Sequence, residues 1–226
     1  MKHKNVYTMI LVFVFCTSCK RQNKTDLQKD DIKSDTKDVT ASYAPKSIIP
    51  TASEKYVIDK KESVVIWKGS MQLAIKGKHT GYIHISKGEL LIEKGRLVGG
   101  TVDVDMNTIA DEKHGSDNEL VRHLKSPDFF DAKTFPITTF LITKVAPADG
   151  ESITVTGDLT IKGITHAVAF PAKIEVKDGV ANVNGKVTID RTRWDVRYNS
   201  GKFFANLADK TISDSIEFNI KIVAKK

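Results

Sequence analysis

His79 and His84 are the first residues of this sequence whose side chains could together bind a metal ion. They lie five positions apart in a stretch that alternates like a β-strand, and successive side chains of a strand point to opposite faces. An odd spacing therefore places the two imidazoles on opposite faces, where joint ligation of one ion is awkward. We expect hydrogen-bonded or solvated histidines here and no metal site.

His114 and His123 flank a second group of residues that could donate or accept protons. The carboxylates of this segment are Asp111, Glu112, Asp117 and Glu119. A charged loop that leads into a helix cap explains this composition without any catalytic role. Asp103 and Asp105 share one face of an expected strand, opposite its apolar face, and are interpreted as a solvated row.

The sequence has no glycine-rich phosphate loop, no nucleophile elbow and no HExxH motif. We therefore expect a protein that is not an enzyme and that carries no cofactor. Its 226 residues are 40% hydrophobic and 28% charged, which excludes a collagen, a wholly disordered chain and a polytopic membrane protein. The net charge of +7, or +5 without Lys2 and Lys4, is spread along the chain, so we expect no nucleic-acid partner.

The first 18 residues have the layout of a secretory signal peptide. Two lysines precede an apolar run from Val6 to Cys16, which is about half the ~20 residues that a membrane-spanning helix needs. The segment Cys16-Thr17-Ser18-Cys19 resembles a bacterial lipobox, which predicts lipidation of Cys19. The alternatives are an ordinary signal peptidase site or a Cys16–Cys19 disulfide. No cysteine follows Cys19, which excludes thiol catalysis, cysteine zinc sites and disulfides from the rest of the chain.

Residues 19–54 are expected to form a flexible tether that is anchored to a membrane through Cys19. They mix both charge signs with polar residues and proline, contain one aromatic residue and show no sustained apolar period. Such a segment cannot bury enough surface to offset its ordering entropy. The alternative is an irregular arm packed on the body. Together, the signal and the anchor predict a lipoprotein of the cell envelope that faces the periplasm; a freely secreted or periplasmic protein is the alternative location.

Residues 55–226 form the expected domain, in which apolar and polar residues alternate with the period of two that β-strands show. The alternation is clearest over residues 101–107, 153–162, 168–176, 181–189 and 216–222. Strands are also expected at 64–69, 79–87 and 89–93. The dipeptides expected to form turns are Lys94-Gly95, Gly99-Gly100, Lys162-Gly163 and Asp178-Gly179.

One short helix interrupts the strands. Ser116 and Glu119 have the spacing of a capping box, apolar residues follow, and Pro127 prevents continuation. About eight or more antiparallel strands with one helical connection indicate an all-β fold, either a closed barrel or a sandwich. The interior of an eight-stranded barrel can be filled by side chains or hold one small ligand, and periodicity does not decide between these states.

Several motifs resemble the YceI family of lipocalin-like, polyisoprenoid-binding proteins, in the same order and over essentially all of residues 55–226. They are Tyr56-Val57-Ile58-Asp59, the segment HLKSPDFFD at 123–131 with Phe135-Pro136, the segment GDLTIKGIT at 157–165, Ile189-Asp190-Arg191, and Trp194. The resemblance implies an extended antiparallel eight-stranded barrel whose apolar lumen holds a long isoprenoid chain. After Arg191 the family usually has an aromatic residue followed by glycine, whereas here Asp195 follows Trp194, which leaves the local turn open.

The expected function is therefore that of an envelope lipid-binding protein that holds a polyisoprenoid or an isoprenoid-quinone-like ligand in its lumen. The alternative is a structural or stress-response protein whose barrel is filled by its own side chains and binds no ligand. The oligomeric state is left open. The residues expected to line the lumen and its mouth are Val102, Val104, Met106, Leu120, Leu124, Phe129, Phe130, Phe140, Leu159, Ile161, Phe170, Trp194, Phe203 and Phe204.

A run of alternating charges from Asp190 to Arg197 leaves two interpretations open. It could be a solvated strand end stabilised by ion pairs. Alternatively, Arg191 or Arg193 could hold a quinone carbonyl or a lipid phosphate at the entrance of the lumen.

Overall fold

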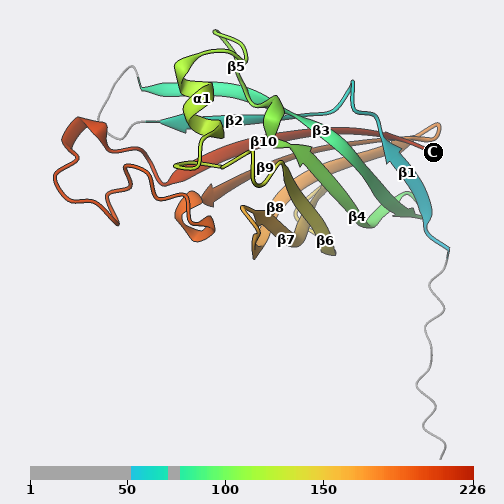
Figure 1. Ribbon diagram of the computed structural model, residues 1–226. Coiled ribbons are helices and arrows are strands. Elements are labelled where there is room, and N and C mark those ends of the chain that lie inside the picture. Colours follow the sequence, from blue (N-terminus) through green and yellow to red (C-terminus); the bar gives the residue numbers. More distant parts are fainter. Residues whose placement is uncertain (1–51, 71–76) are drawn as a thin grey trace, which may run out of the picture. The chain divides into compact units, whose positions relative to one another are not determined.

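The computed structural model describes residues 52–70 and 77–226 (Figure 1). The expected signal peptide at 1–18, Cys19 and all but the last three residues of the expected tether lie outside the described residues. The strands are β1 Glu54–Ile58, β2 Val64–Ser70, β3 Lys78–Glu93, β4 Arg96–Asp105, β5 Ala110–Asp111, β6 Ile137–Pro147, β7 Ser152–Ile161, β8 Ile164–Lys177, β9 Val180–Asp190 and β10 Ser215–Lys225. The helices are α1 Glu119–Lys125 and the 3-10 turns η1 Met106–Thr108, η2 Arg191–Trp194 and η3 Ala208–Lys210.

Eight of these strands close into an antiparallel barrel, in the order β10-β2-β3-β4-β6-β7-β8-β9. Closure is made by β10, which pairs with β9 from Ser215↔Asp190 to Lys225↔Val180 and with β2 along its other edge. Closure satisfies the backbone groups that an open sheet would leave unpaired at its edges. The prediction of an all-β barrel with a short helical connection is confirmed, and the sandwich is excluded.

The two remaining strands extend this barrel. β1 pairs with β3 and β10, and β2 pairs with the same two strands. β1 and β2 therefore lie one after the other in the same gap between β3 and β10. β5 pairs with β3 beside α1. Figure 1 shows α1 and β5 at the end of the barrel where β2 ends, whereas β1 and the C-terminus lie at the other end.

Three of the four expected turns connect neighbouring strands. Lys94-Gly95, Lys162-Gly163 and Asp178-Gly179 are two-residue loops in which both residues have positive φ, as tight turns with right-handed twist require. The fourth expectation was wrong, because Gly99-Gly100 lies inside β4. A Cβ on Gly100 would lie 2.5 Å from the carbonyl oxygen of Glu89, so this glycine permits close approach of β3.

The strands expected at 79–87 and 89–93 are one continuous strand, β3. The register against β4 shifts between Ile85 and Lys87, and the strand continues past this irregularity to Glu93. A β-bulge of this kind bends a strand without ending it.

The expected helix is present, but its cap differs from the prediction. Asn118 rather than Ser116 is the N-cap, and its side-chain oxygen accepts a hydrogen bond from the N–H of Val121 at 3.0 Å. The helix ends at Lys125, two residues before Pro127. Val121 is fully buried, which fixes the apolar face of the helix on the barrel end. Across the described ranges, no helix has the length and apolar character that a membrane crossing requires.

The alternation in the sequence places apolar side chains inside the barrel. Val102, Val104 and Met106 are at most 9% exposed, and burial of such a side chain contributes about 1.5–3 kcal/mol. Asp103, between the two valines, points outward and accepts a hydrogen bond from the Thr139 hydroxyl at 2.8 Å. The alternation therefore identifies the inner face of the wall correctly.

Candidate functional site

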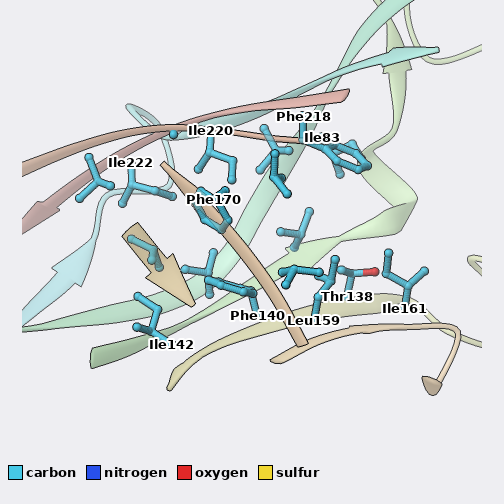
Figure 2. Close-up of a pocket in the computed structure, with 18 of the residues that line it drawn as sticks. Ile83, Thr138, Phe140, Ile142, Leu159, Ile161, Phe170, Phe218, Ile220 and Ile222 are labelled. Carbon is cyan, nitrogen blue, oxygen red and sulfur yellow. The ribbon is translucent and has the colours of Figure 1, made fainter. Parts of the chain in front are cut away.

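A cavity of about 120 Å³ lies inside the barrel and is lined by all eight of its strands. The labelled side chains in Figure 2 converge on this space from facing strands. Thr138 is the single polar residue of the lining. The complete lining comprises Val65, Ile83, Leu90, Leu97, Val102, Val104, Met106, Phe130, Thr138, Phe140, Ile142, Val155, Leu159, Ile161, Val168, Phe170, Val183, Gly185, Val187, Phe218, Ile220 and Ile222. We call this space the lumen cavity.

Two glycines position the largest side chains of the lumen cavity. A Cβ on Gly157 would lie 2.5 Å from the ring of Phe140, and a Cβ on Gly185 would lie 2.8 Å from the ring of Phe170. Both rings therefore pack closely against glycine backbone, and their centroids are 5.5 Å apart. Packing of this kind holds the rings against the wall of the lumen cavity.

A second cavity, of about 130 Å³, lies at the barrel end that α1 covers. Its lining includes polar and charged residues, but nearly all of the surface that they expose to the cavity is apolar. The polar and charged residues are Ser70, His79, His123, Arg191 and Ser213, and the rest of the lining is Trp67, Gly69, Gly77, Ile83, Ile109, Leu120, Leu124, Phe129, Phe130, Ile212, Ile216 and Phe218. We call this space the helix-end cavity.

Three residues line both cavities. They are Ile83 on β3, Phe130 in the segment after α1, and Phe218 on β10. The two cavities are therefore neighbours that share part of their walls.

Eleven of the fourteen expected site residues line one of the two cavities. In the lumen cavity these are Val102, Val104, Met106, Phe130, Phe140, Leu159, Ile161 and Phe170. Leu120, Leu124 and Phe129, with Phe130 again, line the helix-end cavity. The structure thus places most of the expected residues around a common interior, while their contact with a ligand stays a prediction.

Trp194, Phe203 and Phe204 line neither cavity. Trp194 is fully buried, and its Nε1–H donates to the carbonyl of Leu159 at 3.0 Å, so it packs within the structure next to β7. Phe203 and Phe204 are 46% and 49% exposed in the connection between η2 and η3. Sequence reasoning grouped these rings with the others because all lie near strand ends, but a connection can carry aromatic rings on its outer side.

Arg191 is not part of a solvated strand end. It is 1% exposed, and its guanidinium donates to the carbonyl oxygens of Ser213, Val196 and Ile212 at 2.8–3.1 Å. Burial lowers the pKa of Arg191 below its usual value, although Asp214 and Asp190 oppose this effect. Arg191 also lies 5.4 Å from the ring centroid of Phe129, so its main visible role is to tie η2 to the segment before β10.

The charged segment between β5 and α1 is hydrogen-bonded to Asp111, the last residue of β5. Asp111 is 3% exposed and accepts hydrogen bonds from the backbone N–H groups of Lys113 and His114 and from the His114 ring at 2.7 Å. Burial raises the pKa of Asp111, but the bonds from His114 and Lys113 lower it more, and the result is a pKa below the usual value. Among the described residues, no three His, Cys, Asp or Glu side chains are grouped as metal ligands.

Several lining residues were missed by sequence reasoning. Ile83 and Phe218 lie on the inner face by the alternation of their strands, so their period was a usable signal. Trp67 and His123 were not assigned to the interior, because a single tryptophan in a short strand and a histidine in a charged segment carry no distinctive pattern.

Comparisons with known proteins give the family. The chain is similar to a UPF0312 protein of Shewanella denitrificans, with 29% identity over 55% of this chain and 65% of the relative, and to Protein YceI of Escherichia coli O157:H7, with 36% identity over 38% of this chain and 44% of the relative. These matches span less than two thirds of each relative. Among solved structures, the fold is similar to BcnA of Burkholderia cenocepacia, with a TM-score of 0.61 and 22% identity over 74% of this chain and 99% of that one.

A second solved structure with this fold is described as a polyisoprenoid binding domain from Saccharophagus degradans implicated in plant cell wall breakdown. It has a TM-score of 0.52 and 11% identity over 75% of this chain and 97% of that one. The model of the YceI-like domain matches residues 56–224, which include every barrel strand except the last residue of β10. This chain therefore belongs to the YceI-like domain family.

Proposed function

We propose that this chain binds an apolar lipid, of the isoprenoid or isoprenoid-quinone class, inside its barrel. The observation that carries the proposal is the lumen cavity, whose lining is hydrocarbon apart from the hydroxyl of Thr138. An apolar cavity of this kind stays free of water and accepts apolar groups. Burial of ligand surface contributes about 25 cal/mol per Å² before the costs of association are subtracted.

The comparisons support the isoprenoid class within that proposal. A solved structure of the same fold is described as a polyisoprenoid binding domain, and the chain shares its family with YceI. A branched hydrocarbon chain is also complementary to the lining, which is rich in valine, isoleucine and leucine side chains.

The size of the lumen cavity limits what enters without rearrangement. Its volume of about 120 Å³ is slightly below the roughly 150 Å³ of a cavity that accepts benzene. The space therefore fits about one isoprene-sized group. A longer chain requires movement of side chains such as Ile83, Phe130 and Phe218, which line both cavities.

We propose binding rather than catalysis. Ser70, Ser213, His79 and His123 all line the helix-end cavity, but within the described residues no hydrogen bond joins a serine hydroxyl to a histidine ring there. The hydroxyl of Ser213 instead donates to the carbonyl of Ser215 at 3.4 Å. A nucleophile needs an adjacent base, so these residues support no acyl transfer.

The proposed location is the cell envelope, with the barrel facing the periplasm and anchored through a lipid on Cys19. Support for this comes from the sequence alone, where a signal-like segment ends in Thr17-Ser18-Cys19. An anchor at the N-terminus would keep the barrel close to a membrane in which isoprenoid lipids dissolve.

The test is native mass spectrometry of the whole protein, purified from its own envelope, followed by organic extraction. An acyl group on Cys19 is covalent and stays with the polypeptide, so only lipid bound in the barrel enters the extract. A stoichiometric extra mass that extracts as a prenyl chain is the expected result. A polypeptide that is bare, and stays bare after incubation with quinones and polyprenols, would instead support a barrel filled by its own side chains.

A further inference from the structure

The connection between η2 and β10 carries two adjacent large apolar rings on its outer side. Phe203 and Phe204 are 46% and 49% exposed, and neither ring lines the lumen cavity or the helix-end cavity. We call these two residues the aromatic tip. Figure 1 shows the connection, coloured orange to red, reaching beyond the end of β2 at the barrel end that carries α1. Large apolar groups that are exposed together, rather than singly, indicate a contact surface.

A hydrogen-bonded turn at Ser200 holds the aromatic tip in place. The N–H groups of Phe203 and Phe204 both donate to the carbonyl of Ser200 at 3.1 Å. The hydroxyl of Ser200 accepts from the N–H of Lys202 at 3.2 Å, and Ser200 is fully buried. The backbone that presents the two rings is therefore ordered before any contact is made, which reduces the entropy cost of docking.

Two exposed cations accompany the aromatic tip. The guanidinium of Arg197 lies 4.8 Å from the ring centroid of Phe203, and the side chain of Arg197 is 58% exposed. Lys202 directly precedes Phe203, and its side chain is 53% exposed. A segment that combines aromatic rings with basic residues suits the interface of a bilayer that contains anionic lipids, because the rings enter the interface and the cations attract the lipid phosphates.

The acidic residues of the connection lie away from the aromatic tip along the chain. Residues 190–214 contain five basic and four acidic residues, and all four acidic residues lie outside 196–208. Arg197 pairs with Asp195, and Lys202 contacts Asp190 and lies 3.7 Å from Asp214. Ion pairs between exposed groups contribute little, so both cations can exchange a carboxylate for a lipid phosphate at small cost.

The small size of this surface favours a bilayer over a protein partner. A stable protein interface buries about 800 Å² on each side and involves roughly 20–30 residues of each partner. In the described part of this connection, the exposed large apolar residues are Tyr198, Phe203 and Phe204. A bilayer interface needs no complementary shape, and its binding strength grows with the apolar area that enters it and with the attraction between cations and anionic lipids.

The connection also borders the interior of the barrel. Arg191 at its start, and Ile212 and Ser213 near its end, line the helix-end cavity. A bilayer that contacts the aromatic tip would therefore lie beside the barrel end at which α1 and the helix-end cavity are located.

We propose that the aromatic tip is a membrane-docking element, in which Phe203 and Phe204 enter the interface of a bilayer while Arg197 and Lys202 contact the phosphates of its anionic lipids. The docking requires neither a ligand in the barrel nor a lipid on Cys19. It thus goes beyond the proposed function and is tested separately from it.

The test places a fluorescent reporter in the aromatic tip. Phe204→Trp adds an exposed indole to a protein whose own two tryptophans, Trp67 and Trp194, are buried. The whole protein is mixed with vesicles of phosphatidylglycerol and brominated phosphatidylcholine. We expect the added emission to shift to the blue and to fall by about 2-fold or more, because a ring at the boundary of the acyl chains lies close to the bromine atoms.

Leu141→Trp is the matched control for this reporter. Leu141 is 46% exposed, like Phe204, but it lies on the outer face of β6. Its emission should change neither in colour nor in intensity when vesicles are added. Equal responses of Phe204→Trp and Leu141→Trp, or no quenching at position 204, would overturn the docking.

A charge variant tests the role of the cations. In the Phe204→Trp protein, Arg197→Gln should lower the ratio of quenched to unquenched protein about 5-fold, the contribution of one basic residue near an anionic surface. Lys173→Gln on β8 is the control, since this lysine is exposed on the barrel wall, and it should leave the ratio unchanged. Equal effects of the two variants would show attraction by the net charge of the protein and would overturn the contact made by Arg197.

The same reporter distinguishes a bilayer from a second copy of this chain. If another copy covers the aromatic tip, the emission of Phe204→Trp is already blue-shifted without vesicles and changes with protein concentration, and membrane docking is refuted. A lipid on Cys19 would hold the protein at a vesicle without quenching position 204. Quenching by a protein that retains no ligand would refute lipid binding in the barrel alone, whereas a retained ligand without quenching would refute only the docking.

Discussion

The hydroxyl of Ser63 replaces a strand-to-strand hydrogen bond with Val223. Its oxygen accepts from the N–H of Val223 at 2.9 Å and donates to the carbonyl of the same residue at 3.2 Å. Ser63 lies between β1 and β2, where the chain leaves the wall, and it is 1% exposed. The Ser63 side chain thus forms hydrogen bonds to β10 that a neighbouring strand would otherwise form with its backbone.

Replacement of Ser63 by alanine should destabilise the barrel by about 1–3 kcal/mol, because the buried N–H of Val223 then loses its acceptor. The carbonyl of Val223 would still accept from the N–H of Asp59 at 2.8 Å. The measurement is the free energy of unfolding in urea. Thr143→Ala is the control, since that hydroxyl is exposed on β6, and it should change stability by less than about 0.5 kcal/mol. Equal effects of the two variants would contradict the role assigned to Ser63.

Two neighbouring residues of β6 allow a matched test of the lumen cavity. Ile142 lines it, whereas Leu141 points outward and is 46% exposed. Ile142→Trp fills the cavity with an indole and should weaken lipid binding by about 10-fold or more, because overpacking costs roughly 1–3 kcal/mol. Leu141→Trp should leave binding unchanged. Lipid retention after purification measures both, and equal retention would place the ligand elsewhere.

Glu217 on β10 gives a prediction about pH. Hydrogen bonds from Lys186 and Lys68 lower the pKa of Glu217 to about 2. A carboxyl whose pKa is lower in the folded state stabilises the fold above its unfolded pKa and loses this contribution as the pH falls toward 2. Glu217→Gln should therefore lower the melting temperature at pH 7, and its difference from the wild type should shrink between about pH 5 and pH 2. A difference that stays constant with pH would exclude this linkage.

Membrane attachment is tested at Cys19. If the cysteine carries the lipid anchor, Cys19→Ala should move the protein from the membrane fraction to the soluble fraction, because a lipid chain contributes about 0.8 kcal/mol per buried CH₂. Cell fractionation followed by immunodetection measures the distribution. Cys16→Ala is the control and should remain in the membrane. A Cys19→Ala protein that stays in the membrane with its signal removed would count against lipidation.

Local patterns account for what the sequence predicted of the fold. The two-residue period of the strands and the turns at Lys94-Gly95, Lys162-Gly163 and Asp178-Gly179 depend on nearby residues only, and both were predicted correctly. The bulge in β3 and the inner position of Gly100 were missed, since both depend on how β3 pairs with β4. Register between strands is a non-local property that composition does not show.

The candidate site was predictable only in part for the same reason. Alternation identified which residues of β4 and β7 face inward, but not that the interior is partly open. That openness depends on cross-strand contacts such as Phe140 against Gly157 and Phe170 against Gly185. The lining of the helix-end cavity combines Trp67 of β2 with His123 of α1, and no pattern in the sequence relates these two residues.

Asp195 adopts a backbone conformation that is unusual for a residue with a side chain. It follows Trp194 at the end of η2 and has φ 58° and ψ 27°, the left-handed conformation that glycine adopts most easily. Aspartate tolerates this conformation better than most residues other than glycine. The side chain also pairs with Arg197 at 2.5 Å, but both groups are about half exposed and such pairs contribute little.

Asp195→Gly should consequently raise the free energy of unfolding, by up to about 1 kcal/mol, because glycine removes the strain of a Cβ at positive φ. Asp195→Ala loses the same ion pair with Arg197 but keeps the Cβ, so it should be less stable than the wild type. Urea denaturation of the three proteins measures the order glycine, aspartate, alanine. If the glycine and alanine variants were equally stable, the ion pair rather than the backbone conformation would decide the energetics of this turn, and the left-handed geometry would carry no cost.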